Sequence, residues 1–314
     1  MKVVTLTLNP AIDKSSTVDR IAPDSKLRCT KPTFEPGGGG INVSRALHAF
    51  DQDSLALYLG GGATGEMMKE MLTAAGVTLE EIPIADRIRE NFIIYNTTTD
   101  EQFRFGMPGA SVTSEEWGIC LDKLRNLNPF PDYLVCSGSL PSDLPDDAYG
   151  QIAKVVKEKG GKMILDTSGP ALYKALEVGV YLVKPNLKEL SILGDRAEIH
   201  GNDQESIARE LINKGKAEII AVSLGSRGVM LATANEIHYV SPPTIVKKST
   251  VGAGDSMVAG MTYSLLQGKS IEEMARFGVA CGTAATMNPG TQLCKPKDVA
   301  WVLEHVQSSM KMMN

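Results

Sequence analysis

The regular alternation of short apolar segments with helical patterns is the feature that most constrains how this 314-residue chain can fold. Short apolar runs rich in β-branched residues are typical of strands buried on both faces. They occur at residues 3–8, 55–59, 133–136, 163–166, 181–184 and 219–223. Helical patterns occupy residues 42–50, 65–75, 114–126, 146–159, 204–215, 254–267 and 270–288. The alternation predicts an α/β domain whose mostly parallel sheet is joined by crossover helices.

Two stretches, residues 15–34 and 87–107, break this alternation. In the second, two strand-like runs flank a turn-like Thr-Asp-Glu at residues 99–101, which is typical of a β-hairpin. We therefore expect a small sheet that projects as a lid from residues 13–35 and 87–107. The large domain would then comprise residues 1–12, 36–86 and 108–314. Because a bare sheet exposes edges and an apolar face, we expect a second copy to cover it in a homodimer.

Charge and composition exclude several classes of protein. The net charge of −5 argues against a nucleic-acid-binding protein, because a phosphate backbone favours a basic surface. The apolar run at residues 1–8 is too short for a signal peptide or a membrane span, so a cytoplasmic location is expected. The five cysteines include no Cys-x-x-Cys pair, which disfavours a zinc site or a disulfide framework. Neither a Walker A motif nor a dinucleotide-binding Gly-x-Gly-x-x-Gly after the first strand is present.

The strongest chemical signal is the segment Ser-Thr-Val-Gly-Ala-Gly-Asp-Ser-Met at residues 249–257, which enters an apolar helix. The small residues Gly252, Ala253 and Gly254 let backbone N–H groups converge, and the helix dipole makes their surroundings attractive to phosphate. Asp255, taken alone, would be an ordinary acidic residue in a first helical turn. Beside an anion cradle, however, a carboxylate is better explained as a general base next to a transferred phosphate.

A second signal is the run of four glycines at residues 37–40, which precedes a helix. Four glycines cost backbone entropy, and they allow the backbone to approach a ligand closely. Asn42 follows them and offers both a donor and an acceptor to sugar hydroxyls. A flexible linker is the alternative interpretation.

Two further segments are less specific. Asn186 and Glu189 share a helix face and suit hydrated Mg²⁺, although the same spacing is typical of an ordinary helix cap. Residues 223–228 follow another expected strand and fit either a nucleotide-contacting loop or a hairpin turn.

In this order, the segments resemble the ribokinase-like, or PfkB, carbohydrate kinase family over essentially the whole chain. Residues 37–44 are similar to its first signature and residues 250–255 to its second. The resemblance implies a ribokinase-like three-layer fold with a small β-sheet lid. Asp51 departs from the first signature, where Gly or Ser is usual, but Asp also tolerates a left-handed turn.

Within the family, residues 26–30, 34–43, 103–110 and 137–141 are most similar to members that convert ATP and fructose 6-phosphate to fructose 1,6-bisphosphate. Kinases of fructose 1-phosphate and tagatose 6-phosphate typically carry Lys in the glycine run, where this chain has Gly39. Those two substrates remain alternatives. A catalytically silent sugar-phosphate sensor on the same scaffold is a more distant one.

The resemblance also implies roles for individual residues. Asp255 would accept the proton of the sugar hydroxyl beside an anion hole formed by Gly252, Ala253 and Gly254. The expected sugar-phosphate contacts are Asp13, Gly38, Gly39, Asn42, Arg89 and Ser139, with Arg89 pairing the phosphate unless it forms only a solvated lid salt bridge. Arg104, Lys26 and Arg28 are further candidates on the lid.

On the nucleotide side, the expected ATP contacts are Lys184, Asn186, Ser223, Gly225, Gly228 and Thr283. Glu189, together with Asn186, would position Mg²⁺ through water. A monovalent cation, K⁺, would bind to Ser249, Val251, Ala285, Asn288 and Gly290 and strengthen the positive field of the anion hole. The lid of this family supports dimers, whereas tetramers and inhibition by ATP cannot be derived from these residues.

Overall fold

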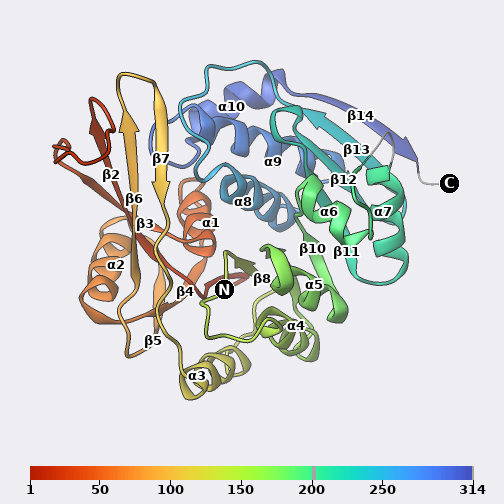
Figure 1. Ribbon diagram of the computed structural model, residues 1–314. Helices are drawn as coiled ribbons and strands as arrows, with labels where there is room; N and C mark the ends of the chain where they lie inside the picture. The colour runs from red at the N-terminus through yellow and green to blue at the C-terminus, as the bar shows by residue number, and fades with distance from the viewer. Residues whose placement is uncertain (200–202, 313–314) are drawn as a thin grey trace.

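The computed structural model describes residues 1–199 and 203–312, and within them ten strands form one large sheet (Figure 1). The strand order is β14 (Gln307–Met312), β13 (Glu236–Ser241), β12 (Val229–Ala232), β11 (Ala217–Ser223), β10 (Val180–Val183), β9 (Lys162–Asp166), β8 (Tyr133–Ser137), β1 (Val3–Thr7), β4 (Leu55–Gly60) and β5 (Leu79–Pro83). Neighbours from β11 to β5 pair in parallel, whereas β12, β13 and β14 extend the sheet with antiparallel pairings. The carboxyl ends of the parallel strands therefore lie along one edge, where ligands bind in open α/β sheets.

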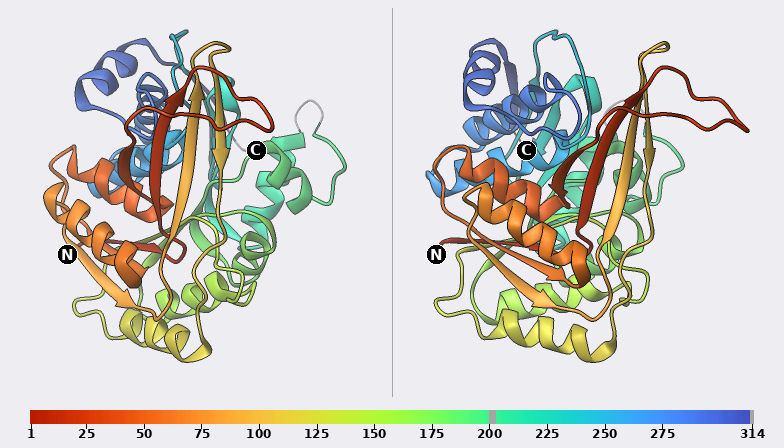
Figure 2. Two further views of the ribbon diagram at one scale, coloured as in Figure 1. Left: turned by 60° about the vertical axis from the view of Figure 1, so that its left-hand side comes forward. Right: turned by 90° about the vertical axis from the view of Figure 1, so that its left-hand side faces the viewer.

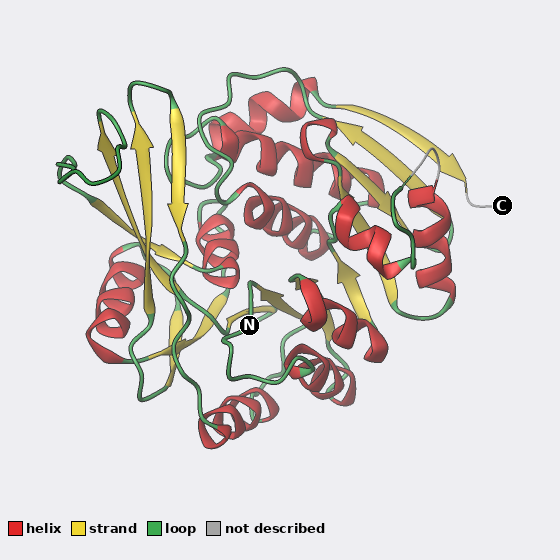
Figure 3. Cartoon of the chain, viewed as in Figure 1, coloured by secondary structure: helices red, strands yellow, loops and turns green. Residues whose placement is uncertain are grey.

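Helices cover both faces of this sheet and give the molecule three layers (Figure 3). One face carries α1 (Gly39–His48), α8 (Ala253–Leu266), α9 (Ile271–Thr286) and α10 (Pro296–His305). The other carries α3 (Ser114–Arg125), α4 (Ala148–Glu158), α5 (Gly169–Val178), α6 (Leu187–Leu193) and α7 (Asp203–Asn213). A smaller apolar cluster holds α2 (Gly62–Ala74) against β4. This arrangement confirms the expected ribokinase-like α/β fold.

Successive side chains of the central strands enter opposite cores, which explains why these strands are mainly apolar. In β9, Met163 and Leu165 pack on the face of α4, whereas Ile164 packs on the face of α8. Both faces exclude water, so exposed polar positions do not alternate with apolar ones, and even the polar Thr5 and Thr7 of β1 are buried. All six expected strands and all seven expected helices are present, with end points shifted by a few residues. The sequence patterns did not indicate α5, α6, α10, β5 or the antiparallel strands β12, β13 and β14, most of which are short.

A second sheet has the strand order β3 (Thr33–Gly37), β2 (Ala11–Val18), β6 (Arg89–Asn96) and β7 (Glu101–Phe105). The antiparallel pairing of β6 with β7 confirms the predicted hairpin, while β2 pairs with β6 in parallel. Figure 2 shows this small sheet standing beside the main body, with the loop between β2 and β3 projecting from it. Among its exposed residues are Phe34, Phe103 and Phe105.

Two further observations concern the backbone and the helices. Asp51 adopts the left-handed conformation expected of it, with a φ of 54°. None of the described helices combines the length and the apolar character that crossing a membrane requires.

Candidate active site

The glycine run lies against the carboxyl ends of β1 and β8. A Cβ atom on Gly40 would come within 2.6 Å of the Leu6 carbonyl oxygen and of Thr7 Oγ1, and one on Gly39 would overlap Ser137. Gly38, with a φ of 119°, caps the start of α1 in a conformation that side chains disfavour. The run is therefore a fixed structural element, which argues against the flexible-linker interpretation. It brings Asn42, in the first turn of α1, to the carboxyl edge of the sheet.

The second glycine segment forms the amino terminus of α8. Gly252 is the N-cap residue, with a φ of 72° in the left-handed region, and Ala253 and Gly254 begin the helix. The first N–H groups of a helix have no partner within it, so this end can bind an anion. The predicted anion cradle is thus placed at a helix terminus, with Asp255 in its first turn.

Asp255 lies where α8 meets α1 and β8. Its Oδ2 accepts a hydrogen bond of 2.8 Å from Asn42 Nδ2, and its Oδ1 accepts a longer one of 3.5 Å from Ser137 Oγ. Burial raises the pKa of Asp255 to about 6, and the nearby Asp166 adds to the shift, while Asn42 and Lys184 oppose it. A carboxylate with a pKa near the working pH is suited to act as a general base.

Lys184 follows β10 and supplies a buried cation beside the same helix end. Its Nζ forms an ion pair of 3.0 Å with Asp166 Oδ1 at the end of β9. Burial by itself lowers the pKa of Lys184, but the Asp166, Asp255 and Glu189 carboxylates together hold that pKa above its usual value. Lys184 therefore stays protonated and can attract phosphate oxygens near Gly254.

On the sugar side, Asp13 and Arg89 come from adjacent strands of the small sheet. Asn91 donates a hydrogen bond of 3.0 Å to Asp13, and burial raises the pKa of this carboxyl. Arg89 donates to the backbone carbonyls of Asn9 and Met107, at 3.2 Å each. These contacts hold the Arg89 guanidinium at the junction of the two sheets and disfavour a solvated salt bridge.

Asn9 is a residue of this site that the sequence analysis missed. Its Nδ2 donates to Ser139 Oγ at 3.1 Å, and its backbone accepts from Arg89, so it joins two of the expected sugar-phosphate contacts. Asn9 Oδ1 and Arg89 Nε are buried, and neither has a partner within the described residues. The Asn-Pro step directly after the first apolar run was the available signal.

The three remaining lid candidates are placed differently. Arg104, on β7, reaches the loop before α8, where its Nη2 donates to Thr250 Oγ1 at 2.8 Å. Lys26 and Arg28 are exposed on the projecting loop between β2 and β3 (Figure 2). The single chain therefore brings Arg104 to the site but leaves Lys26 and Arg28 on the outside of the sheet.

A cleft of about 660 Å³ begins at the amino terminus of α8. Five of the six expected nucleotide contacts line it, and Asn186 does not; the five are Lys184, Ser223, Gly225, Gly228 and Thr283. The turn at residues 223–228 connects the antiparallel strands β11 and β12, so it is both a hairpin turn and part of the cleft wall. Ser226, within the segment 223–228, also lines the cleft. The cleft further contains residues that were not predicted: Pro242, Pro243, Thr244, Ile245, Lys247, Met257, Val279, Gly282 and Thr286. The Pro242–Pro243 step could have indicated a loop beside the cleft. The small and apolar residues of α9 could not have been recognised, because they are typical of any buried helix.

Asn186 and Glu189 form a reciprocal cap at the start of α6. Asn186 Oδ1 accepts from the Glu189 backbone at 2.9 Å, and Glu189 Oε2 accepts from the Asn186 backbone at 2.8 Å. The ordinary helix cap is therefore real, and the second carboxylate oxygen of Glu189 takes no part in it. Within residues 1–199 and 203–312, no group of three or more His, Cys, Asp or Glu side chains is arranged to hold a metal ion. These donors fit a Mg²⁺ held mainly by water and nucleotide phosphates.

The candidate K⁺ ligands come from two places in the chain. Ser249 and Val251 lie in the loop before α8, whereas Ala285 lies in the last turn of α9 and Asn288 and Gly290 lie in the loop after it. Ser249 Oγ donates to the Gly290 carbonyl at 2.7 Å, and the Val251 backbone donates to Ser249 Oγ at 3.2 Å. The Asn288 side chain donates to the carbonyls of Ala284 and Leu293. The fold thus brings these segments together beside the anion cradle, and their oxygen atoms are of the kind that binds alkali cations.

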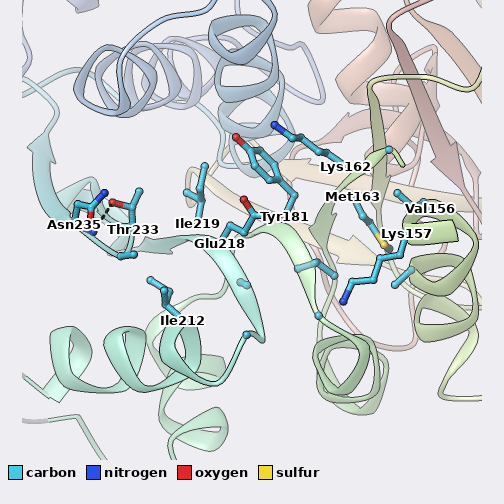
Figure 4. Close-up of a pocket in the computed structure, with 17 residues that line it drawn as sticks. Val156, Lys157, Lys162, Met163, Tyr181, Ile212, Glu218, Ile219, Thr233 and Asn235 are labelled. Atoms are coloured by element: carbon cyan, nitrogen blue, oxygen red, sulfur yellow. Dashed lines mark hydrogen bonds between the residues drawn. The ribbon is translucent and has the colours of Figure 1, made fainter. Parts of the chain in front are cut away.

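Another cavity, of about 510 Å³, lies at the opposite edge of the main sheet (Figure 4). Its lining includes Lys162, Val180 and Ala217, the first residues of β9, β10 and β11. The Lys157 amine donates to the Val178 carbonyl, and Lys162 lies 4.4 Å from the centre of the Tyr181 ring. The cations of this cavity are engaged in structural contacts, and none of the expected sugar-phosphate, nucleotide or cation contacts lines it.

Comparisons with known proteins agree with this geometry. Residues 3–298 match the model of the pfkB family carbohydrate kinases. The chain is 41% identical over 299 residues to ATP-dependent 6-phosphofructokinase isozyme 2 of Escherichia coli, covering 95% of this chain and 96% of that protein. It is 33% identical to 1-phosphofructokinase of Borreliella burgdorferi, covering 96% of each. A crystal structure of phosphofructokinase-2 from Escherichia coli in complex with potassium superposes with a TM-score of 0.92 at 40% identity, covering 97% of this chain and 98% of that one. The chain belongs to the pfkB family of carbohydrate kinases.

Proposed function

We propose that this kinase transfers the γ-phosphoryl group of ATP to the C1 hydroxyl of fructose 6-phosphate and releases fructose 1,6-bisphosphate. The observation that carries the proposal is the position of Asp255. It lies in the first turn of α8, next to Ala253 and Gly254 of the nucleotide cleft, and accepts a hydrogen bond from Asn42 of the glycine-run helix. The greater identity to a 6-phosphofructokinase than to a 1-phosphofructokinase supports the choice of sugar.

In the transfer step, Asp255 accepts the proton of the C1 hydroxyl, and the freed oxygen attacks the γ-phosphorus in line with the leaving ADP. The backbone N–H groups at Gly252, Ala253 and Gly254 stabilise the negative charge that develops on the transferred group. Lys184 contributes a fixed positive charge on the nucleotide side. A bound Mg²⁺ would neutralise the ATP phosphates, with Glu189 and Asn186 holding its water ligands.

Two features of the site bear on how the phosphate of the sugar is held. Arg89 Nε is buried and has no partner in the described residues, so a phosphate oxygen would supply the missing acceptor. Position 39 accepts no side chain without displacing Ser137, so this chain cannot place a lysine there as fructose 1-phosphate and tagatose 6-phosphate kinases typically do.

The small sheet is proposed to act as a lid and as a dimer interface. Residues 13–35 and 87–107 would close over the sugar and exclude water, with Arg104 and its contact to Thr250 marking the closed position. The exposed Phe34, Phe103 and Phe105 would be covered by a second copy. We also propose that K⁺ binds beside the anion cradle, as the potassium complex of the Escherichia coli protein suggests.

The test is ADP release in a coupled assay with fructose 6-phosphate, tagatose 6-phosphate and fructose 1-phosphate in parallel, with Mg²⁺ and with or without K⁺. A clear preference in kcat/KM for fructose 6-phosphate is expected. Preference for another sugar would retain the mechanism and change the substrate. Binding of all three sugars without turnover would overturn the proposal in favour of a sensor.

A further inference from the structure

A chain of polar contacts connects the small sheet to the catalytic carboxylate through two residues with no role in the proposed transfer step, Glu35 and Arg45. The Thr291 hydroxyl, in the loop after α9, donates to Glu35 Oε2 on β3. Glu35 Oε1 forms an ion pair of 3.7 Å with Arg45 Nη2 on α1. Arg45 Nη1 donates to Asn42 Oδ1 at 3.2 Å, and Asn42 Nδ2 donates to Asp255 Oδ2 at 2.8 Å.

The guanidinium of Arg45 determines which way the Asn42 amide points. A guanidinium has only donors, so the Asn42 atom that faces it has to be the oxygen. The amide nitrogen then faces Asp255 and donates to it. Without Arg45, the hydrogen bond to Asp255 alone would hold this orientation, and the amide would be less firmly aligned with the carboxylate. Arg45 is itself held by the Pro36 carbonyl at 2.8 Å, and its side chain is 18% exposed.

Charged and polar groups from every neighbouring element act on Asp255. Asp166, at the end of β9, is a like charge, whereas Lys184, after β10, is an opposite one. Ser137 of β8 and Asn42 of α1 donate hydrogen bonds to it. Arg45 also interacts with Asp255 electrostatically, and its other charged neighbours are Glu35 on β3 and Asp13 on β2. Arg45 therefore acts on the base twice, through the amide and through its charge.

We propose that Arg45 is a positioning residue for phosphoryl transfer, which orients the Asn42 amide and thereby keeps Asp255 ionised and aligned with the sugar hydroxyl. Glu35 and Thr291 tie Arg45 to the small sheet and to the loop of Asn288 and Gly290. The orientation of the base is thus linked to the position of both segments. This inference rests on the proposed role of Asp255 as the base.

The test begins with Arg45→Met and its matched control, Arg125→Met, which removes an exposed arginine paired with Asp122 on α3. Loss of Arg45 is expected to lower kcat about tenfold, a typical loss for one charge-assisted hydrogen bond. The acid limb of the kcat profile is expected to move to higher pH by roughly half a unit or more, because an opposite charge and a donor to the carboxylate are lost. The KM for ATP should stay within about twofold of wild type, since Arg45 does not line the nucleotide cleft. The control should leave all three quantities unchanged.

A double-mutant cycle with Asn42→Ala separates the route through the amide from a structural role. If Arg45 works through Asn42, the shift of the acid limb caused by Arg45→Met shrinks in the Asn42→Ala background. A folded Arg45→Met enzyme with an unmoved acid limb, or strictly additive shifts, would overturn the proposal. Arg45→Lys provides a second variant should the methionine variant not fold, and it is expected to restore the charge but only part of the rate.

Titration of the Asp255 carboxyl by ¹³C NMR needs no turnover. It therefore distinguishes a failure of this inference from a failure of the proposed reaction. The Asp255 pKa should rise in Arg45→Met even if none of the three sugars is phosphorylated, and an unchanged pKa would contradict the role of Arg45.

Discussion

The end of α8 and the small sheet contribute to the same site, but they are built in opposite ways. Asp255 is hydrogen-bonded by Asn42 and Ser137 and lies near the buried Lys184–Asp166 pair, all of them anchored in the large sheet and its helices. The small sheet instead exposes Phe103 and Phe105, which are 36% and 47% accessible, and extends a projecting loop. The end of α8 is held in place by many contacts, whereas one side of the small sheet is exposed.

The difference follows from what each region has to do. A base and an anion hole stabilise a transition state only if they are held in place before the reaction, so they belong on a rigid sheet edge. A sugar has to enter and leave, so the groups that cover it belong on a segment with few contacts. Three variants sharpen or break this division between the two regions.

The largest effect is expected from Asp255→Asn, which keeps the shape of the rigid region but removes its base. We expect kcat to fall at least about a hundredfold, the lower range for loss of a general base. ATP binding should persist, because the cleft and the helix terminus are retained. Single-turnover rates and nucleotide titration measure the two quantities. Turnover close to wild type would show that the rigid region does not supply the base.

The same substitution tests the energetic cost of the rigid site. Folding raises the pKa of Asp255 from its ordinary 3.8 to about 6. Stability is therefore lost as the pH rises between these two values, because the unfolded chain releases this proton while the folded chain still holds it, and the loss is complete above about pH 6. Asp255→Asn should stabilise the protein at pH 8 by about 3 kcal/mol, given that one pKa unit corresponds to about 1.4 kcal/mol. The gain should shrink towards pH 4. Thermal melts across this pH range measure the gain in stability. A variant that is less stable than wild type at pH 8 would contradict the raised pKa of Asp255.

Placing a charge on the exposed face of the small sheet tests whether that face forms the dimer interface. We expect Phe105→Asp to dissociate the proposed dimer and to raise the KM for fructose 6-phosphate about tenfold, since a buried interfacial charge is strongly unfavourable. Ile119→Asp on α3 is a matched control, because both side chains are 47% exposed. Sedimentation and steady-state kinetics report the two effects. If both variants remain dimeric, the dimer interface lies elsewhere.

The smallest effect is expected where the two regions touch. Arg104→Met removes the contact with Thr250, an exposed hydrogen bond worth about 1 kcal/mol or less. We expect the KM values to rise roughly two- to fivefold while kcat and thermal stability hardly change. A large fall in kcat would instead show that Arg104 takes part in the phosphoryl transfer step.

Local sequence patterns predicted most of the fold because the responsible forces act locally. Strands such as β8 and β9 are apolar on both faces, and the capping residues of α3 and α9 lie within four positions of their partners. Likewise, the start of α8 could be predicted locally, because it consists of a left-handed glycine followed by a helical pattern. The short antiparallel strands β12 and β13 have no comparably strong pattern and were missed.

What the sequence by itself determined is the fold class, the two glycine-rich signatures and the identity of the acid at the start of α8. Only the tertiary structure decided which neighbours act on that acid. Asn42 and Asp255 are 213 positions apart, and Asp166 and Lys184 come from two further segments. The pKa of a carboxyl group depends on burial and on charges within a few ångströms. Such distances arise only when strands and helices far apart in the chain are packed together.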